Sequence, residues 1–424
     1  MNCILFFMQR VFLIVTIFLI SVCNLSAAEH PPGYVELIDL PITVRVDTTD
    51  ADIKAVYDLW RRFLSSNPDS AIDSSLWNQK ELKRYSEPYA ARSWIYNSQN
   101  IIKSFPPLLL SIEKEGKFYA IRTLYYSQGL EDPYKSSNPW ALQTVYARKV
   151  KIKIKKEDKE KKIDTLPQGK RVAYQSPMPD SLRKKKDPTE YRLFDPLHVI
   201  TASWRNRRMG PIDYHFPHDY FFDRGEGLRM TKFIKTVRKK YKLPKVSPIE
   251  FYITRNQDEI AAAAGLEFIL APSAGRSNTP NAQVFSSLAS EWYPHEITHI
   301  LFREYKPHFI LNEGIATFLG GSMNRPFDSL AVDLAEFFEI NDTITFQQIL
   351  DSPFLEGSTV TYYTVGAVLC KMAYQQGKAE KVRELLSSGV SDDELYATIK
   401  QVLGINKQDV TRAIRQKTKE YADR

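Results

Sequence analysis

The order of periodic segments predicts an α+β fold for this chain of 424 residues. A helical repeat of apolar residues at 52–64 is followed by alternating strand patterns between residues 108 and 150. Strand and helix patterns are then mixed between residues 212 and 286, and only helical patterns follow residue 329. Runs of helices and strands that do not alternate strictly are typical of the α+β class. We therefore expect a small N-terminal α+β module, followed by a domain with a mixed-sheet lobe and a helical C-terminal lobe.

The first 28 residues have the pattern of an export signal. Arg10 precedes an apolar run at 11–22, which is short for a membrane span, and small residues end at Ala28. Residues 20–23 resemble a loose bacterial lipobox, although valine replaces the usual small residue before the cysteine. We expect an exported chain, periplasmic or secreted. The alternative is a chain that is lipid-anchored through Cys23.

Three cysteines limit the covalent chemistry of the chain. Cys3 and Cys23 fall within the export signal, so Cys370 is the only cysteine of the expected mature chain. An internal disulfide framework is therefore excluded. The apolar neighbours of Cys370 favour a buried structural thiol.

The chain carries a formal charge of +8, and loss of Arg10 with the export signal leaves +7. Two basic runs, at 149–162 and 183–186, contribute much of this excess. Such runs are usually solvated strand ends or loops, and the alternative is contact with an anionic surface. No pattern of aromatic residues suited to base stacking accompanies them. Nucleic acid is therefore not an expected partner.

The N-terminal module is expected to span residues 29–175. Its predicted elements are strands at 41–46, 108–113, 118–126 and 140–150, and helices at 52–64 and 77–96. Gly116 is predicted to form the tight turn of a hairpin. This order of elements resembles that of nuclear-transport-factor-2-like domains, in which helices pack on a curved antiparallel sheet. The module contains no cluster of His, Cys, Asp or Glu to which we assign chemistry.

A proline-rich segment at 176–204 is the expected linker to a second domain at 205–424. The predicted elements of the first lobe are strands at 212–216, 249–254, 266–270 and 283–286, and helices at 227–241 and 256–264. Residues 272–280 have the composition of a polar loop, and 283–286 is expected at a sheet edge. Leu228, Phe233, Ile234 and Val237 are expected to face a core. Helices of the second lobe are predicted at 329–338, 359–376, 378–386, 392–403 and 407–422.

The stretch from His295 to His299 has the pattern H-E-x-x-H. On a helix, the two histidines lie one turn apart on one face, where both imidazoles can bind a single zinc ion. Glu296 adjoins that face, and its carboxylate can act as a general base toward a water at the metal. The alternative is a chance pair of core or surface histidines. Since the chain has only seven histidines, a chance match is rare.

A zinc enzyme of this kind needs a third protein ligand and one open position. Glu304 lies on another face of the same helix, Tyr305 takes the place of a third histidine in a related motif, and His308 lies in a turn. Glu313 is a better candidate because a second, antiparallel helix would bring it back over the histidine face. Gly314 is small enough to allow the close helix packing that this requires.

The two segments together resemble the zinc site of the gluzincin metallopeptidases. His295-Glu296-x-x-His299 is followed after thirteen residues by Glu313 within N-E-G-x-A. The similarity extends to the peptidase MA-like proteins and more distantly to the aminopeptidase N type, and it covers roughly residues 205–424. It implies zinc ligation by His295, His299 and Glu313, with Glu296 as the general base. Thr317 occupies a position where some relatives carry a carboxylate that orients a zinc histidine.

Tyr363 extends the resemblance, because Tyr363-Thr364-Val365-Gly366 matches the Y-x-x-G of the aminopeptidase N type. The similarity implies that the Tyr363 hydroxyl stabilises the oxyanion of the reaction, and Tyr362 is the alternative for that role. Aminopeptidases of that type have a longer spacer before the glutamate and a glycine-rich exopeptidase motif before the first histidine. The spacer here is shorter and that motif is absent, so aminopeptidase specificity is not implied.

We expect an exported zinc metallopeptidase with one Zn²⁺ ion and a peptide or protein substrate. The cleft would lie between the two lobes, and the strand at 283–286 would pair with an extended peptide. The alternative is a binding protein of the cell envelope that keeps the metallopeptidase fold without catalysis. An intact Glu296 favours the enzyme, since a structural zinc site has no use for a general base.

Overall fold

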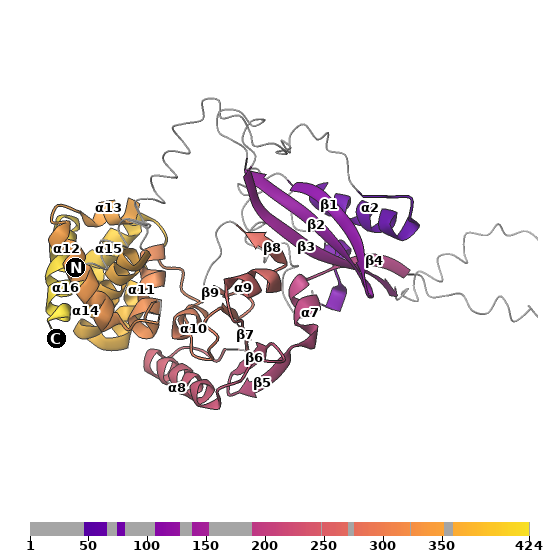
Figure 1. The fold of residues 1–424 in the computed structure, drawn as a ribbon. Coiled ribbons are helices and arrows are strands. Elements are labelled where there is room, and N and C mark those ends of the chain that lie inside the picture. Colours follow the sequence, from indigo (N-terminus) through magenta and orange to yellow (C-terminus); the bar gives the residue numbers. More distant parts are fainter. Residues whose placement is uncertain are drawn as a thin grey trace, which may run out of the picture. The chain divides into compact units, whose positions relative to one another are not determined.

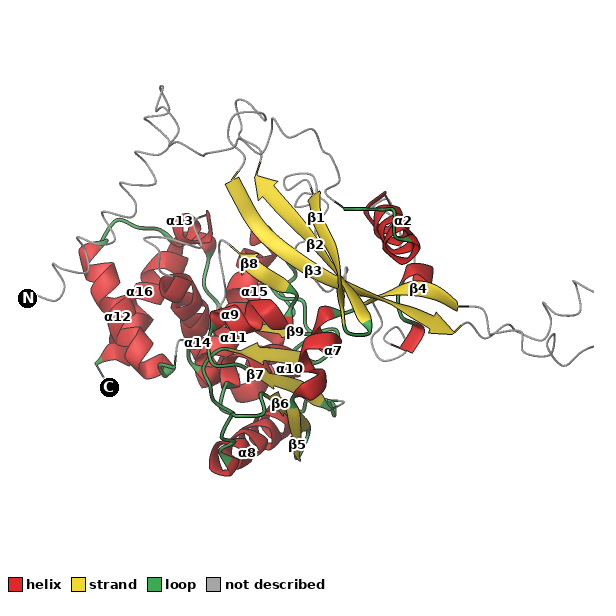
Figure 2. Cartoon of the chain, turned by 45° about the vertical axis from the view of Figure 1, so that its right-hand side comes forward, coloured by secondary structure: helices red, strands yellow, loops and turns green. Residues whose placement is uncertain are grey.

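The computed structural model describes residues 46–65, 74–80, 107–127, 138–151, 189–246, 248–269, 275–322, 324–351 and 359–423. In these residues the protein belongs to the α+β class, as predicted. It has two five-stranded sheets and a helical C-terminal part (Figure 1, Figure 2). The predicted export signal, residues 41–45 of the first predicted strand, most of the helix predicted at 77–96 and the basic run at 183–186 lie outside the described residues. Among the described helices, none combines the length and the apolar character needed to span a bilayer.

The first sheet is an antiparallel meander of four strands, β1 (Pro107–Glu115), β2 (Phe118–Ser127), β3 (Asn138–Lys151) and β4 (Thr189–Phe194). Gly116 has a positive φ of 59°, which confirms the tight turn predicted between β1 and β2. Helix α2 (Ala51–Ser65) contributes its predicted apolar stripe to the core of this sheet. The buried Trp60 indole donates a hydrogen bond of 3.0 Å to the Thr123 hydroxyl, so its N–H is satisfied there.

Strand β8 (Leu266–Ile269) is predicted from the sequence, but it belongs to the first sheet rather than to the lobe that surrounds it in sequence. It pairs antiparallel with β3. The Glu267 carboxylate reinforces this pairing by accepting hydrogen bonds from Thr144 at 2.6 Å and from Arg122 at 2.8 Å. Periodicity identifies a strand, whereas the sheet that it joins depends on long-range pairing.

The segment expected to be a linker, 176–204, contains regular structure at its C-terminal end. Strand β4 lies within it, followed by helix α7 (Pro196–Ile200) and the 3-10 helix η3 (Thr201–Ser203). The Asp195 side chain caps α7 by accepting a hydrogen bond from the Leu197 N–H at 3.0 Å. Pro196, which suggested a linker, occupies the first turn of α7. An N–H in the first turn of a helix makes no hydrogen bond within the helix, so proline is tolerated there.

The second sheet has the order β5 (Arg205–Met209), β6 (Ile212–Phe216), β7 (Ile249–Ile253), β10 (Gln283–Ser286) and β9 (Gly275–Asn278). The three inner strands are parallel, and both outer strands are antiparallel to their neighbours. Helices α8 (Arg224–Tyr241) and α10 (Pro294–Leu301) share a core with one face, and α7 and α9 (Gln257–Ala263) share a core with the other. Successive side chains of β7 point to opposite faces of the sheet, so Phe251 belongs to the first core and Tyr252 to the second.

Two predictions about this sheet are wrong. The strand at 283–286, expected at the edge, is β10 and lies between β7 and β9. Residues 275–278, expected in a loop, form β9, which is the outer strand. The sequence Gly-Arg-Ser-Asn lacks apolar alternation because all four residues are only half-buried.

Helix α8 also differs from its prediction. It begins at Arg224, three residues earlier than expected, because the Asp223 carboxylate accepts a hydrogen bond of 2.6 Å from the Gly225 N–H. Leu228 is 54% exposed rather than in the core, and the buried stripe contains Ile234 and Val237 as predicted.

The C-terminal part consists of α11 (Phe309–Gly320), α12 (Phe327–Ile340), α13 (Phe346–Asp351), α14 (Thr359–Leu385), α15 (Asp392–Leu403), η5 (Lys407–Asp409) and α16 (Val410–Ala422). All five helices predicted after residue 329 are present, and α13 was not predicted. Helix α14 contains a kink at Gly377 and Lys378, which separates two of the predicted helices. Cys370 is fully buried in this core, which confirms the predicted structural thiol.

Candidate metal centre

The two motif histidines lie on α10, as the sequence predicts. Pro294 occupies the first turn of this helix, and Ile297 and Ile300 are buried in the core that α10 shares with the second sheet. His295 and His299 lie one turn apart, with ring centroids 5.0 Å apart. Both residues are only 7% exposed. The helix therefore presents two imidazoles on one face, away from its core side.

Helix α11 brings Glu313 to the two histidines. A Glu313 carboxylate oxygen lies 3.2 Å from His295 Nε2 and 3.5 Å from His299 Nε2. Donor atoms of the three residues all lie within 4.8 Å of one another, and all three residues are buried. Among the described residues, this is the group of His, Cys, Asp and Glu side chains that could hold a metal ion. The short turn between α10 and α11 thus assembles the cluster that the sequence predicted.

The tautomer of His295 is set by the backbone of Gly321. The Gly321 carbonyl accepts a hydrogen bond of 2.7 Å from His295 Nδ1, so the proton of the neutral ring is on Nδ1. His295 Nε2 then presents a lone pair to the Glu313 carboxylate, an arrangement that requires a shared proton or a bound cation. Gly321 has a φ of 78°, a conformation that favours glycine at this position. A hydrogen bond from the other ring nitrogen to a backbone carbonyl fixes the orientation that a histidine needs if it is to bind a metal ion.

Thr317 does not orient either histidine. Its hydroxyl is buried and, among the described residues, has no hydrogen-bond partner. The backbone carbonyl of Gly321 performs for His295 the role that the resemblance assigned to a side chain at position 317. His299 Nδ1 is likewise buried without a hydrogen-bond partner among the described residues.

The charges of the cluster favour a cation. Burial opposes protonation of His299, but the hydrogen bond and the negative charge of Glu313 raise the His299 pKa to about 9. Burial acts to raise the pKa of Glu313, but its polar contacts with the His295 and His299 rings lower that pKa to about 2. A carboxylate that stays ionised in a buried position needs a positive partner, which a proton on histidine or a metal ion supplies.

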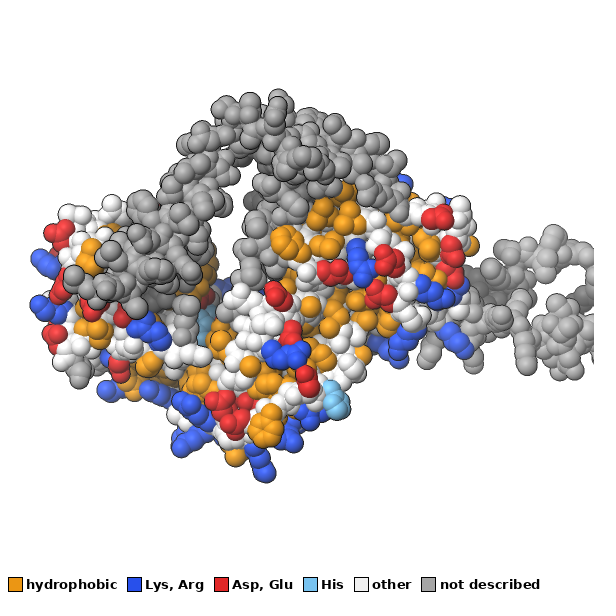
Figure 3. Space-filling view, in the orientation of Figure 1, with side chains coloured by type: hydrophobic (Ala, Val, Ile, Leu, Met, Phe, Trp, Pro, Cys, Tyr) orange, Lys and Arg blue, Asp and Glu red, His pale blue; other side chains and the backbone are white. Residues whose placement is uncertain are grey.

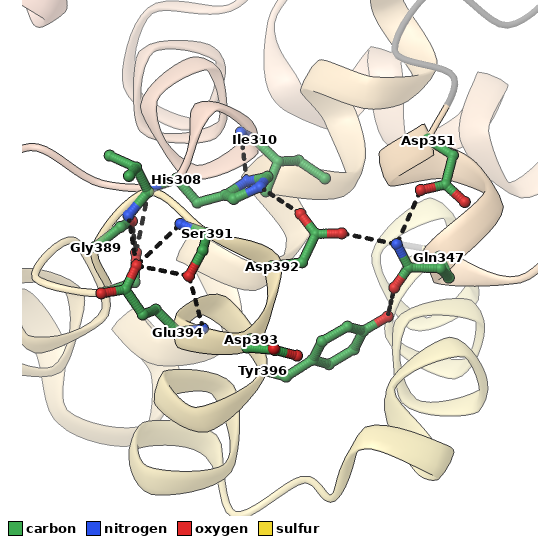
Figure 4. A network of polar contacts seen from close by, with 12 residues as sticks. His308, Ile310, Gln347, Asp351, Gly389, Ser391, Asp392, Asp393, Glu394 and Tyr396 are labelled. Carbon is green, nitrogen blue, oxygen red and sulfur yellow. Dashed lines mark hydrogen bonds and ion pairs between the residues drawn. The ribbon is translucent and has the colours of Figure 1, made fainter.

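His308, a possible ligand by sequence, instead fixes the start of α11 (Figure 4). Its Nδ1 accepts a hydrogen bond of 3.2 Å from the Ile310 N–H, and its Nε2 donates to Asp392 at 3.0 Å. Asp392 in turn accepts a hydrogen bond of 2.7 Å from the Gln347 amide. This network connects the helix that carries Glu313 to α13 and α15. His308 therefore contributes to positioning of Glu313 rather than to metal binding.

An open cleft of about 1370 Å³ lies against the cluster. Glu296 and all three candidate ligands line it, together with residues of β9, of the segment that follows α10, and of α14. Among the described residues, no side chain or backbone N–H donates a hydrogen bond to the Glu296 carboxylate. The carboxylate is thus next to the cluster and available to a molecule in the cleft.

The two candidate tyrosines differ in position. Tyr363 lines the cleft, and its ring stacks on His295 with centroids 5.9 Å apart. Burial, followed by the negative charges of Glu313 and Glu296, raises the pKa of Tyr363, so its hydroxyl keeps its proton. Tyr362 is 3% exposed, belongs to the core and is not among the residues that line the cleft. Of the two candidates for an oxyanion donor, only Tyr363 is therefore among the residues that line the cleft.

Tyr293, which no sequence motif indicated, immediately precedes α10 and also lines the cleft. Burial, followed by the negative charge of Glu296, raises the pKa of Tyr293. A Cβ atom built on Gly275 would lie 2.5 Å from the Tyr293 hydroxyl oxygen, so this hydroxyl rests against the start of β9. Its position next to H-E-x-x-H was visible in the sequence, but its approach to β9 depends on a strand that the sequence pattern did not indicate.

Comparison with known proteins does not assign the chain to a family. No protein-family model matches the chain, and a search of curated proteins finds no significant match.

Proposed function

We propose that the protein is an exported zinc metallopeptidase of the gluzincin type, which hydrolyses peptide bonds. One observation carries the proposal: the buried side chains of His295, His299 and Glu313 converge in the same cleft that the Glu296 carboxylate lines. A structural metal site would be closed and would not need this additional carboxylate.

The donor atoms suit zinc. Two imidazole nitrogens and one carboxylate oxygen make a mixed set with three protein ligands, which is typical of catalytic zinc and leaves a fourth position open. Magnesium and calcium instead favour sites made of oxygen atoms. When bound, zinc would polarise a substrate carbonyl and lower the pKa of a bound water to about 7.

Glu296 and Tyr363 have separate roles in this proposal. The Glu296 carboxylate takes a proton from the attacking water and passes it to the leaving amine, so that water and one peptide bond become a carboxylic acid and an amine. The Tyr363 hydroxyl donates a hydrogen bond to the substrate oxygen as negative charge develops on it. The raised pKa of Tyr363 supports this role, because a phenol must keep its proton in order to donate it.

Strand β9 offers the substrate a main-chain partner. It is the outer strand of the second sheet, and Gly275, Arg276 and Ser277 from it line the cleft. Since one side of β9 pairs with β10, its other side can accept an extended peptide as an additional antiparallel or parallel strand. Such pairing recognises backbone rather than side chains, which suits a peptide or protein substrate.

The replacement Glu296→Gln tests the proposal. The amide keeps the shape of the side chain but cannot accept the proton, so hydrolysis of a fluorogenic peptide library should fall by at least about 100-fold. Zinc content, measured by mass spectrometry of the purified protein, should stay at one ion per chain. A chelator should abolish the activity of the unmodified protein, and added zinc should restore it.

Glu304→Gln is the matched control, because Glu304 is an exposed carboxylate that lines the same cleft. It should retain full activity. Full activity of Glu296→Gln would refute the enzymatic assignment. Zinc binding together with peptide binding, but no hydrolysis by the unmodified protein, would instead support the non-catalytic binding protein.

A further inference from the structure

Positive charge is concentrated in one continuous segment of the second sheet and its first helix. Residues 205–245 contain twelve Lys and Arg residues and four Asp and Glu residues, a net charge of +8. This equals the net charge of the entire chain. The segment comprises β5, β6 and α8, and Figure 3 shows Lys and Arg side chains gathered along the lower edge, over α8 and β5.

The solvent face of α8 carries a stripe of lysines. Lys232, Lys235 and Lys239 follow one another at helical spacing of three and four residues and are all exposed. The opposite face of the helix is buried through Ile234 and Val237. Among the described residues, none forms an ion pair with these three lysines. Their charges are therefore not compensated within the described protein, and like charges at this spacing repel one another.

An exposed apolar side chain, Phe221, lies just before the N-terminal end of the same helix. Phe221 is 90% exposed, although large aromatic residues are normally at least partly buried. Arg205 from β5 donates a hydrogen bond to the Tyr220 carbonyl, and Arg207 lies over the Phe222 ring at 4.9 Å. The residues on either side of Phe221 thus contact the two arginines. Leu228, on the first turns of α8, adds a second exposed apolar side chain.

We propose that this surface, formed by β5, Phe221 and the lysine stripe of α8, binds the anionic headgroups of a phospholipid bilayer. The cations match a negative membrane surface, and each Lys or Arg near such a surface adds to binding. Phe221 inserts into the region between headgroups and acyl chains, where an aromatic ring is stabilised. A purely electrostatic polyanion site would gain nothing from an exposed phenylalanine next to its cations.

The surface is independent of the metal centre. None of the residues that line the cleft belongs to 205–245. Membrane binding would therefore hold the protein at a bilayer surface whether or not the proposed peptidase activity exists. The inference and the proposed function can fail separately.

Vesicle sedimentation of the expected mature chain, beginning at Glu29, tests the inference. The protein should bind vesicles of phosphatidylcholine mixed with phosphatidylglycerol, and it should not bind vesicles of phosphatidylcholine alone. Replacement of Lys232, Lys235 and Lys239 by Ala should lower the partition coefficient at low salt by about 100-fold. Alanine maintains the helix, so the variant should fold normally. Phe221→Ala should lower the coefficient by roughly tenfold, with little dependence on salt.

A matched control removes three exposed lysines elsewhere, through Lys400→Ala, Lys407→Ala and Lys419→Ala on α15, η5 and α16. This variant has the same net charge as the stripe variant and should bind vesicles like the unmodified protein. Equal loss in both triple variants would overturn the inference, because net charge alone would then explain binding. So would absence of binding to the anionic vesicles. Tighter binding to duplex DNA than to these vesicles, unaffected by Phe221→Ala, would also overturn it.

Discussion

A Cβ atom built on Gly314 would lie 2.6 Å from the carbonyl oxygen of Gly366, so α11 and α14 cross with their backbones in contact. Glu313 immediately precedes the first glycine, and Tyr363 lies one helical turn before the second. The crossing therefore holds a candidate metal ligand and a candidate oxyanion donor beside the same cleft. The close contact between the two backbones therefore explains why both N-E-G-x-A and Y-x-x-G have a glycine at the crossing.

Gly314→Ala should destabilise the protein and weaken zinc binding. The added methyl group meets backbone atoms of α14 rather than a flexible side chain, so the two helices must separate. We expect a loss of about 2 kcal/mol in the free energy of unfolding, measured by urea denaturation. Gly225→Ala is the control, because its Cβ would approach only the Asp223 carboxylate, at 3.1 Å. A neutral Gly314→Ala variant would contradict the backbone contact.

Glu313→Ala should lower zinc affinity while leaving the fold intact. Loss of partners that merely support a ligand costs 10- to 100-fold in affinity, so loss of a ligand should cost more than about 100-fold. Competition against a chromophoric chelator would measure the change. Circular dichroism would confirm that the variant is folded, and Glu304→Ala provides a control in the same cleft. Unchanged zinc affinity would remove Glu313 from the ligand set.

Tyr363→Phe and Tyr362→Phe should behave differently. Removal of the Tyr363 hydroxyl should lower kcat by about 100-fold and leave zinc content unchanged, since one oxyanion donor has this magnitude of effect. Tyr362 belongs to the core and is not among the residues lining the cleft, so Tyr362→Phe should retain kcat. Steady-state kinetics on the best peptide substrate would compare the two. The reverse order of effects would transfer the role to Tyr362.

Zinc affinity should increase with pH. In the metal-free protein the pKa of His299 is raised to about 9, so this histidine holds a proton at neutral pH that zinc must displace. The Glu313 pKa is lowered to about 2, so its carboxylate takes up no competing proton near neutrality. Below pH 9, apparent affinity should therefore rise by about tenfold per pH unit. Calorimetry in buffers of different ionisation enthalpy would count the released proton, and an affinity independent of pH would contradict the protonated histidine.

Tyr293→Phe should weaken transition-state binding through loss of a hydroxyl that lines the cleft. We expect a fall in kcat/KM of about tenfold, the equivalent of one hydrogen bond. Gly275→Ala should have a similar effect, because its Cβ would displace the Tyr293 ring rather than remove the hydroxyl. If both act through the same group, the double variant should be no worse than either single variant. Additive losses would show that the two residues act separately.

The sequence was sufficient for most of the local elements and for the three residues of the candidate metal site. Helical spacing put His295 and His299 on one face of α10. The short turn before α11 favoured an antiparallel helix pair, which brings Glu313 back to that face. Apolar alternation was also sufficient for the inner strands, such as β7, because strands buried on both faces consist of apolar residues. These inferences depend only on residues that are close in sequence.

Tertiary structure decided the features that depend on distant segments. Strand β8 joined the first sheet, and the polar strand β9 became the outer strand of the second, through hydrogen bonds that no local pattern records. The orientation of His295 by the Gly321 carbonyl, in place of a side chain at position 317, has the same origin. Sequence periodicity determines which face of an element is apolar. Pairing between elements determines which backbone groups and hydroxyls reach the candidate metal site and its cleft.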